Sequence, residues 1–365
     1  MLLLTLILFI VYLGFILWLE NGLAGSSRKP PSKSTSPSAG PRFSVIIAAH
    51  NEAAVIRDTL KAILTQSYPP ENFEVIVAAD RCRDDTVEIV REFAGEYPNL
   101  NWVEISSIPD GTAPKKHALQ KGIAKAKYSH LVMLDADCRP GPDFLQSYAD
   151  YFQTGAEAVL GIPKIRWHSA APHCYLLPER LIVWGTAAAA VGHQAPFLAF
   201  GGSWAYSKSA FERIGGFAQI SQSLSGDDDL LVQRMSDAGI KVVMNWNPAG
   251  WVYTEAPQTW RELYRQRRRH HSAGKFYPKK LQAAYALFHL SELALYVMPL
   301  ISPPAIIFLS GKWFLDLLAL KRLAALFLES LGFRHIICYE IGALIHHGII
   351  APLSQIGQPR WGKRQ

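Results

Sequence analysis

Four segments of strand length, three of them mostly apolar, alternate with stretches of helical length between residues 43 and 134 of this 365-residue chain. The expected strands are Phe43–Ala49, Phe73–Ala79, Asn101–Ile105 and Leu131–Leu134, and the expected helices between them are Glu52–Gln66, Thr86–Phe93 and Lys115–Ala126. This alternation is typical of an α/β domain in which helices cover a mostly parallel sheet. In an open sheet of this class, ligands bind beyond the carboxyl ends of the strands.

Polar residues follow three of these strands. His50-Asn51-Glu52 comes after the first, Asp80 after the second and Asp135-Ala136-Asp137 after the fourth. Carboxylates gathered on one rim repel one another unless a cation and hydrogen-bond donors are present. Carboxylate oxygens suit Mg²⁺ or Mn²⁺, which proteins usually share with a substrate phosphate. The pattern as a whole favours a nucleotide with a bound metal.

Each of these motifs also has a purely structural explanation. Asp135 and Asp137 can form a solvated acidic turn before the loop that begins at Cys138. Asp80 or Asp84 can cap the helix that follows them, and Glu52 can lie in the first turn of its own helix. The functional interpretation therefore rests on their occurrence together at successive strand ends.

Apolar segments at both ends of the chain predict membrane helices. Met1–Leu19 carries no charged side chain and has about the length needed to cross a bilayer, which gives an anchor over residues 1–20. A signal peptide cleaved near Gly22-Leu23-Ala24 is the alternative, but no Lys or Arg precedes the apolar run. The basic residues after it, Arg28, Lys29, Lys33 and Arg42, place the α/β domain in the cytoplasm.

The remaining segments complete the expected organisation. Residues 21–41, rich in Ser and Pro, form a flexible linker, and residues 42–280 form the α/β domain. Residues 281–356 form membrane or interfacial helices, and residues 357–365 form a basic tail.

Three apolar stretches near the carboxyl end are candidates to cross the membrane. Ala284–Leu309 and Ile336–Ile356 are expected to span, and Trp313–Leu328 either spans or lies at the interface. A basic, cytoplasmic tail requires an even number of crossings after the domain. Two spans with one interfacial helix are therefore preferred to three spans.

Charge and cysteine content narrow the function classes. The formal net charge is +7, and Lys and Arg cluster beside the apolar segments and in Arg267-Arg268-Arg269. Such clusters indicate a membrane surface or phosphate-bearing ligands rather than nucleic acid. The four cysteines form no Cys-x-x-Cys pair, so they suggest neither a disulfide framework nor a cysteine zinc site, and a reducing compartment fits.

These motifs together resemble those of inverting family 2 glycosyltransferases, which have a GT-A fold: a Rossmann-like mixed sheet of the nucleotide-diphospho-sugar transferase type. The motifs follow the family's order over roughly residues 43–271: Val45–Glu52, Asp80, Lys115–Gln120, Asp135-Ala136-Asp137, Ser225–Leu230 and Gln266–His270. The membrane-bound members include ceramide glucosyltransferases and polysaccharide synthases.

The resemblance assigns roles to individual residues. It implies that Asp137 ligates Mg²⁺ or Mn²⁺ on the diphosphate of a nucleotide-sugar donor, expected to be a UDP-sugar. The donor-binding residues are then Ala49, Asn51, Glu52, Asp80, Lys115, Asp135, Gln266 and Arg269. The donor-sugar and acceptor region comprises Gly202, Ser203, Trp204, Asp228 and His270.

Three consecutive aspartates precede the expected helix Leu230–Ala238. A helix N-terminus favours negative charge, but one aspartate suffices for a cap. The resemblance places Asp227 at the catalytic base position, with Asp228 or Asp229 taking that role if the register shifts. The base would accept a proton from an acceptor hydroxyl that attacks the anomeric carbon opposite the departing nucleoside diphosphate, so the configuration inverts.

Three further segments each keep more than one interpretation. Gly201-Gly202 permits close approach of a ligand or forms a tight turn. Trp204 packs on a sugar or belongs to the core. The apolar stretch Tyr175–Val191 lines an acceptor groove, lies at the membrane or is a buried packing helix.

The expected helix Trp260–Ala273 places Gln266, Arg269 and His270 on one face. Arg267 and Arg268 are expected to form a basic face at the membrane surface. The family pattern here is Gln-x-x-Arg-Trp, and His270 stands where Trp is usual. That Trp lies at the acceptor end in polymerising members, so its absence weakens the interpretation of this chain as a processive synthase.

The sequence thus predicts a multi-pass membrane glycosyltransferase that moves a sugar to a lipid-linked or membrane acceptor, with its catalytic domain in the cytoplasm. A processive polysaccharide synthase is the nearest alternative. A non-catalytic membrane scaffold that binds nucleotide is the alternative from another class.

Overall fold

The computed structural model describes residues 1–26, 31, 40–166 and 172–354, which form two compact units. The sheet unit comprises Ser26–Arg166 and Gln194–Ala256, and the helical unit comprises Met1–Gly25, Trp167–His193 and Pro257–Pro359. Most of the expected linker and the whole basic tail lie outside the described residues.

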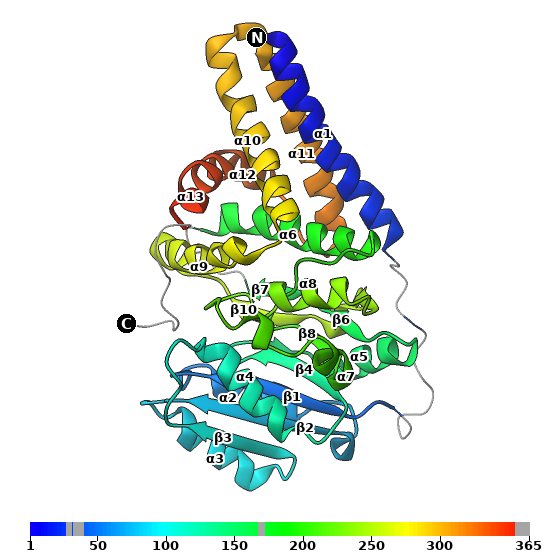
Figure 1. Ribbon diagram of the computed structural model, residues 1–365, viewed down its shortest axis with the longest axis vertical. Helices are drawn as coiled ribbons and strands as arrows, with labels where there is room; N and C mark the ends of the chain where they lie inside the picture. Colours follow the sequence, from blue (N-terminus) through cyan, green and yellow to red (C-terminus); the bar gives the residue numbers. More distant parts are fainter. Residues whose placement is uncertain (27–30, 32–39, 167–171, 355–365) are drawn as a thin grey trace. The chain divides into compact units, whose positions relative to one another are not determined.

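The sheet unit is built on a seven-stranded mixed sheet of order β3-β2-β1-β4-β8-β6-β9 (Figure 1). Its strands are β1 (Phe43–Ala49), β2 (Phe73–Asp80), β3 (Leu100–Ile105), β4 (His130–Asp135), β6 (Ala158–Leu160), β8 (Trp204–Ser207) and β9 (Val242–Met244). The first four are parallel, and β8 is antiparallel to both of its neighbours. A second sheet joins β5 (Arg139–Pro140), β10 (Val252–Glu255) and β7 (Pro163–Arg166).

The helices of the sheet unit are α2 (Ile56–Leu64), α3 (Thr86–Glu96), α4 (Pro114–Lys125), α5 (Phe144–Gln153), α7 (Lys208–Arg213) and α8 (Asp229–Asp237). The four expected parallel strands and the helices between them are confirmed. Helix α2 begins at Ile56 rather than Glu52, because Asn51 has a φ of 56° and because the Glu52 N–H donates to the Thr86 hydroxyl at 2.9 Å.

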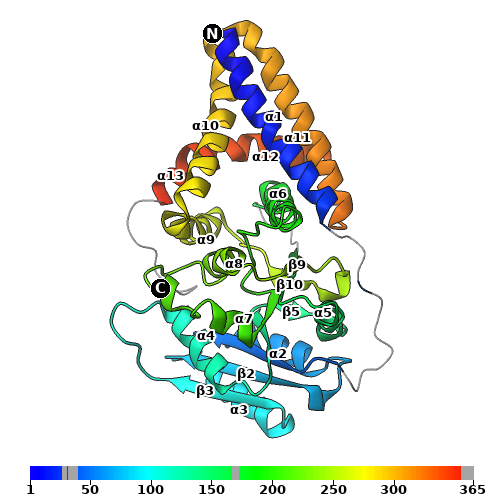
Figure 2. The ribbon, with the colours of Figure 1, turned by 45° about the vertical axis from the view of Figure 1, so that its right-hand side comes forward.

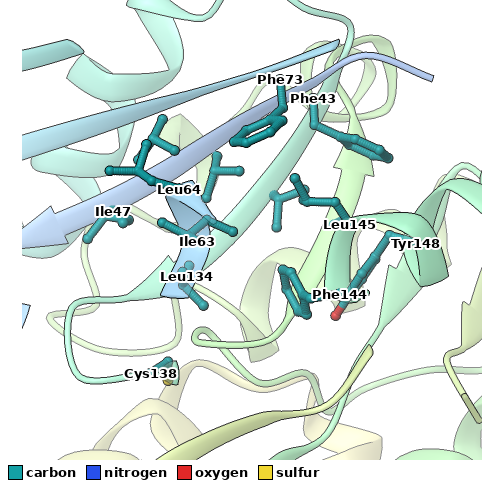
Figure 3. Packing of buried hydrophobic residues seen from close by; sticks show 14 of the residues in the cluster. Phe43, Ile47, Ile63, Leu64, Phe73, Leu134, Cys138, Phe144, Leu145 and Tyr148 are labelled. Carbon is teal, nitrogen blue, oxygen red and sulfur yellow. The ribbon is translucent and has the colours of Figure 1, made fainter. Parts of the chain in front are cut away.

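The core of the sheet unit holds the strands in register. Figure 3 shows its aromatic and aliphatic side chains, among them Phe43 of β1, Phe73 of β2, Leu134 of β4 and Phe144 of α5. Each is at most 2% exposed, and burying such a side chain contributes about 1.5–3 kcal/mol. The core therefore fixes where the strands end. The ends of β2, β1 and β4 lie side by side in that order in the sheet.

The helical unit contains α1 (Leu2–Gly25), α6 (His173–Gly192), α9 (Trp260–Ser272), α10 (Lys279–Ile301), α11 (Ile306–Leu326), α12 (Phe333–Ile345), the π-helical turn η7 (His346–Ile350) and α13 (Ala351–Ser354). Helices α1, α10 and α11 lie side by side in both views (Figures 1 and 2). Aromatic and aliphatic side chains fill the space between them, including Tyr12, Phe288 and Leu295.

Among the residues that the structure describes, four helical segments are long and apolar enough to cross a membrane: Leu2–Gly25, Lys279–Ile301, Pro303–Leu326 and Phe333–Ser354. Trp313–Leu328 was expected either to span or to lie at the interface. The helix that contains most of it meets the length and composition of a span.

Helix α6 packs closely on α1. A Cβ atom placed on Gly22 of α1 would lie 2.4 Å from the Ala189 carbonyl oxygen of α6, so only glycine allows this approach. Trp184 of α6 is fully buried. Of the interpretations open for Tyr175–Val191, the structure supports the buried packing helix. Helices α6 and α9 were both expected within a continuous domain over residues 42–280. In the structure both belong to the helical unit.

Candidate active site

The register of the sheet brings the polar strand ends together. Ala48 of β1 pairs with Asp135 of β4, and Ala49 pairs with Ala79 of β2, which precedes Asp80. The expected convergence of these carboxylates on one rim is therefore present. Adjacent strands are about 4.8 Å apart, so the rim is of a size to be bridged by one small ligand.

Asp80 is completely buried and is held by its neighbour Arg81. The Arg81 guanidinium donates two hydrogen bonds to the carboxylate, Nε to Oδ1 at 2.9 Å and Nη2 to Oδ2 at 2.8 Å. Arg81 has a φ of 47°, and this left-handed turn directs its side chain back onto Asp80. Sequence reasoning missed Arg81, whose only signal was its position beside Asp80 at a strand end.

The segments after β1 and β2 are tied to each other. The Arg83 N–H donates to Asn51 Oδ1 at 2.8 Å, and the Ala53 N–H donates to Asp84 Oδ2 at 3.0 Å. Asp84 also accepts from the Thr86 N–H at 3.2 Å, at the start of α3. Asp84, rather than Asp80, thus accepts a backbone N–H at the start of α3, whose N-cap residue is Asp85, and Asp80 stays at the rim.

Lys115, in the first turn of α4, is the central cation of the site. Its Nζ lies 2.9 Å from Asp135 Oδ1 and 2.9 Å from Asp227 Oδ2. Burial raises the pKa of Asp227, but the Lys115 ammonium outweighs this effect and holds that pKa below its ordinary value. Burial lowers the pKa of Lys115, and the carboxylates Asp135 and Asp227 more than reverse this, so the ammonium stays charged. Asp227 is thus an ionised carboxylate, suited to accept a proton.

The three consecutive aspartates have different partners. Asp228 Oδ1 accepts from the Asp229 N–H at 2.8 Å, and its Oδ2 accepts from the Gly201 N–H at 2.8 Å. Asp229 Oδ1 accepts from the Ala199 N–H at 3.0 Å. Burial and the adjacent Asp227 raise the pKa of Asp228 to about 6. Asp228 and Asp229 therefore hold backbone, whereas Asp227 is the aspartate that faces Lys115.

Lys116 is a functional neighbour that sequence reasoning missed. It is 3% exposed, and its Nζ donates to three backbone carbonyls: Ile220 at 2.7 Å, Ser223 at 2.6 Å and Ser225 at 2.9 Å. These bonds fix the loop that leads into Asp227. Burial lowers the pKa of Lys116 to about 8, with Asp227 and Asp228 partly offsetting the shift. A lysine beside Lys115 gave no sign in the sequence that it points inward.

Asp135, Asp137 and the Cys138 thiol place their potential ligand atoms within 4.8 Å of one another. Two carboxylates at a turn fit a hard divalent cation, since their oxygens are its preferred ligands, while the thiol is a poor ligand for it. The donor set therefore fits the metal expected at Asp137.

The glycines before β8 allow a close approach within the site. A Cβ on Gly202 would lie 2.9 Å from Asp135 Oδ2, and one on Gly201 would lie 3.0 Å from Lys115 Nζ. Ser203 is fully buried. Trp204 is 1% exposed and packs on Tyr206 with ring centroids 4.6 Å apart. The interpretation of Trp204 as a sugar platform is therefore corrected, because a core position leaves no ring face for a ligand.

Gln266, Arg269 and His270 lie on α9 in the helical unit, and their contribution to a site remains a prediction. The expected basic surface at Arg267 is wrong. Arg267 is 2% exposed, and its Nη2 lies 2.8 Å from Glu179 Oε2 of α6. A buried guanidinium requires a carboxylate partner, and Glu179 supplies it.

Comparison with known proteins identifies the family. Residues 41–273 match the family model described as glycosyltransferase like family 2. A probable glycosyltransferase of Bacillus subtilis, YdaM, is 32% identical over 63% of this chain and 54% of its own length. The beta-monoglucosyldiacylglycerol synthase of a Nostoc species is 31% identical over 31% of this chain and 24% of its own length. The chain thus spans about half the length of the first of these relatives, and less of the second.

A solved structure shares the fold over nearly the whole chain. The Pyrobaculum calidifontis mannosyltransferase PcManGT, determined in complex with GDP-Man and Mn²⁺, superposes with a TM-score of 0.59. The superposition covers 94% of this chain and 96% of that one at 22% identity, which supports the fold. The strand-end carboxylates, the mixed sheet and the family match over residues 41–273 agree: the chain belongs to the family 2 glycosyltransferases and has their GT-A fold.

Proposed function

We propose that this protein is an inverting glycosyltransferase that moves a sugar from a nucleotide donor, in the first instance a UDP-sugar, to a membrane-borne acceptor. The observation that carries the proposal is the contact of Lys115 with both Asp135 and Asp227, each at 2.9 Å. Through the Lys115 ammonium, this contact links Asp135, expected near the donor diphosphate, to Asp227, the ionised base.

Asp227 is the base of the proposed reaction. The acceptor hydroxyl attacks the anomeric carbon, its proton passes to an Asp227 oxygen, and the bond from that carbon to the diphosphate oxygen breaks on the opposite side. The sugar leaves with inverted configuration, and the nucleoside diphosphate is the other product. Lys115 stabilises the charge that develops on the diphosphate, and the resemblance to the family assigns Arg269 the same role.

Asp137, with Asp135 beside it, would hold Mg²⁺ or Mn²⁺, which supplies further charge stabilisation to the leaving diphosphate. Ala49, Asn51, Glu52 and Asp80 would bind the nucleoside at the ends of β1 and β2. The buried Asp80 is already oriented by Arg81, so its oxygens are fixed where ribose or base donors would arrive.

A lipid or lipid-linked acceptor is supported by the helices of the described part of the chain that are able to cross a bilayer. A cytoplasmic site beside the bilayer meets lipid headgroups directly. The name of the Nostoc relative, a beta-monoglucosyldiacylglycerol synthase, supports a glycolipid product. The processive alternative is disfavoured because His270 stands where the polymerising members have Trp. The scaffold alternative is disfavoured because Asp227 is ionised and paired with Lys115.

The test is product analysis of the membrane-embedded protein. It is incubated with a panel of UDP- and GDP-sugars, lipid extract and Mn²⁺ or Mg²⁺, and products are identified by mass. We expect one lipid to gain a single sugar, with no product when a chelator replaces the metal. Transfer only to water-soluble acceptors contradicts the membrane acceptor, a ladder of masses contradicts single transfer, and turnover without metal removes the role given to Asp137.

A further inference from the structure

The helical unit contains a second group of metal-ligating side chains, remote in sequence from the carboxylates of the sheet unit. His289 and Glu292 lie on α10, and His347 lies in the π-helical turn η7. One ligand atom from each of the three lies within 4.8 Å of the other two. We call these residues the His-Glu-His cluster.

The polar atoms of this cluster lack aligned hydrogen bonds. Glu292 is 1% exposed, and both of its oxygens, together with Nδ1 of each histidine, are buried without a hydrogen-bond partner of good geometry. Glu292 Oε2 lies 2.5 Å from His347 Nδ1 and 4.0 Å from His289 Nδ1, yet neither nitrogen is aligned for a hydrogen bond. Buried polar groups are normally satisfied, so several orphans aimed at one point indicate a missing partner.

The charges around the cluster are also unbalanced. Lys312 Nζ lies 2.7 Å from Asp316, 2.8 Å from Glu340 and 3.5 Å from Glu292, and all four side chains are at most 9% exposed. One ammonium against three carboxylates leaves two negative charges when the histidines are neutral. Uncompensated charge is very costly inside a bundle of apolar helices. A divalent cation supplies the two missing positive charges.

We propose that His289, Glu292 and His347 bind a divalent transition-metal ion, with Zn²⁺ the best match. Two imidazole nitrogens and one carboxylate are a zinc donor set, whereas Mg²⁺ prefers oxygen ligands alone. Tetrahedral zinc ligands at about 2.0–2.2 Å from the metal lie roughly 3.4 Å from each other. The separations of 2.5 Å and 4.0 Å from Glu292 Oε2 bracket that value, so small side-chain movements complete the site.

The π-helical turn supports the assignment independently. Residues 346–350 form this rare element, which occurs mostly at functional positions because it re-aims side chains that a regular helix would place elsewhere. Here it brings His347 to Glu292 of α10. It also brings His346 to His271 of α9, and the Nε2 atoms of these two histidines are 2.6 Å apart. The metal would thus join α10 to the turn that also contacts α9. Apolar helices gain little association energy from the hydrophobic effect in a bilayer, so such a cross-link is of structural value.

Metal analysis of the full chain tests the proposal. The protein is produced with zinc in the medium, purified in detergent, dialysed against a weak chelator and analysed by elemental mass spectrometry. We expect about one zinc ion per chain in the wild type. Glu292→Gln and His347→Gln should lose it. His335→Gln, which changes a buried histidine of α12 outside the cluster, and Asp137→Asn, which changes the carboxylate site, should retain it.

A second measurement does not depend on the variants folding. Wild-type protein stripped of metal and loaded with Co²⁺ should show the visible absorption of tetrahedral nitrogen and oxygen ligation, and added Zn²⁺ should remove it. The alternative is that protonated histidines, rather than a metal ion, neutralise the cluster. The wild type would then hold no more zinc than Glu292→Gln and would show no such absorption, and the proposal would be wrong.

Discussion

The electrostatics of the candidate active site depend on one residue, Lys115. Its ammonium contacts Asp135 and Asp227, and its charge keeps the Asp227 carboxyl ionised although that side chain is largely buried. A buried carboxylate without such a partner would be protonated near neutral pH and could not accept a proton. The availability of the base is therefore a property of the pair rather than of Asp227 alone.

Replacing Lys115 should move the acid limb of the pH–rate profile upward. In Lys115→Met the ammonium is absent, so burial, opposed only by a backbone hydrogen bond and by Lys116, raises the pKa of Asp227. The rate should then fall at a pH about one unit or more above the wild-type limb, with a lower maximal rate. Lys121→Met, an exposed change on the same helix, should leave the profile unaltered. An acid limb that does not move in Lys115→Met would show that Lys115 does not set the pKa of the base.

At this scale the sequence predicted the residues whose position follows from topology. Asp80, Asp135 and Asp137 are reached by the rule that ligands bind at strand ends. Lys116 and Arg81 were missed because the direction of a long side chain depends on tertiary contacts. Arg267 was misassigned because three consecutive arginines look like a surface patch, while its carboxylate partner Glu179 lies 88 residues away.

At the scale of elements, β1, β2 and β4 were predictable because each is a largely apolar run that is buried on both faces. Strand β3 lies at the edge of the sheet and has exposed residues, so only its place in the alternation of strands and helices indicated it. The short strands β5, β7, β9 and β10 were not predictable, since two to four residues carry no readable periodicity. The start of α2 was also missed. Its first turn is displaced because the N–H groups of Glu52 and Ala53 donate to Thr86 and Asp84, more than thirty residues further along the chain.

The packing of α1 on α6 gives a prediction with an internal control. Gly22→Leu would place side-chain atoms against Ala189, so it should force the helices apart and lower the thermal unfolding midpoint in detergent. Gly14→Leu adds the same side chain to the same helix where nothing lies within 4 Å, so it should be tolerated. Both changes increase the apolar character of α1 equally, and a difference in membrane insertion cannot explain the result. Equal midpoints for the two variants would contradict the close packing at Gly22.

At the scale of the whole molecule, the sequence predicted an α/β domain flanked by membrane helices. It did not predict that α6 and α9 would join the helices from the two ends. Their apolar or basic composition does not show which partner buries them. Contacts between residues distant in sequence, such as Gly22 with Ala189, determine which helices group together.

The expected cytoplasmic location of the sheet unit can be tested by labelling. Asp110→Cys, at an exposed position, is introduced into a chain lacking the four native cysteines and treated with a membrane-impermeant thiol reagent. The basic residues after the first apolar segment predict labelling in inside-out vesicles and none in intact cells. Labelling of intact cells would place the sheet unit on the opposite side.

The central claim is that Asp227 is the catalytic base, and the neighbouring aspartates provide its control. Sugar transfer is measured for Asp227→Asn and Asp229→Asn in the membrane-embedded protein with saturating donor and metal. Loss of the base should lower kcat about 10²–10⁴-fold. An asparagine at 229 can still accept the Ala199 N–H, so kcat of that variant should stay near the wild-type value. Asp227→Asn with unchanged turnover, or a loss confined to Asp229→Asn, would contradict the account.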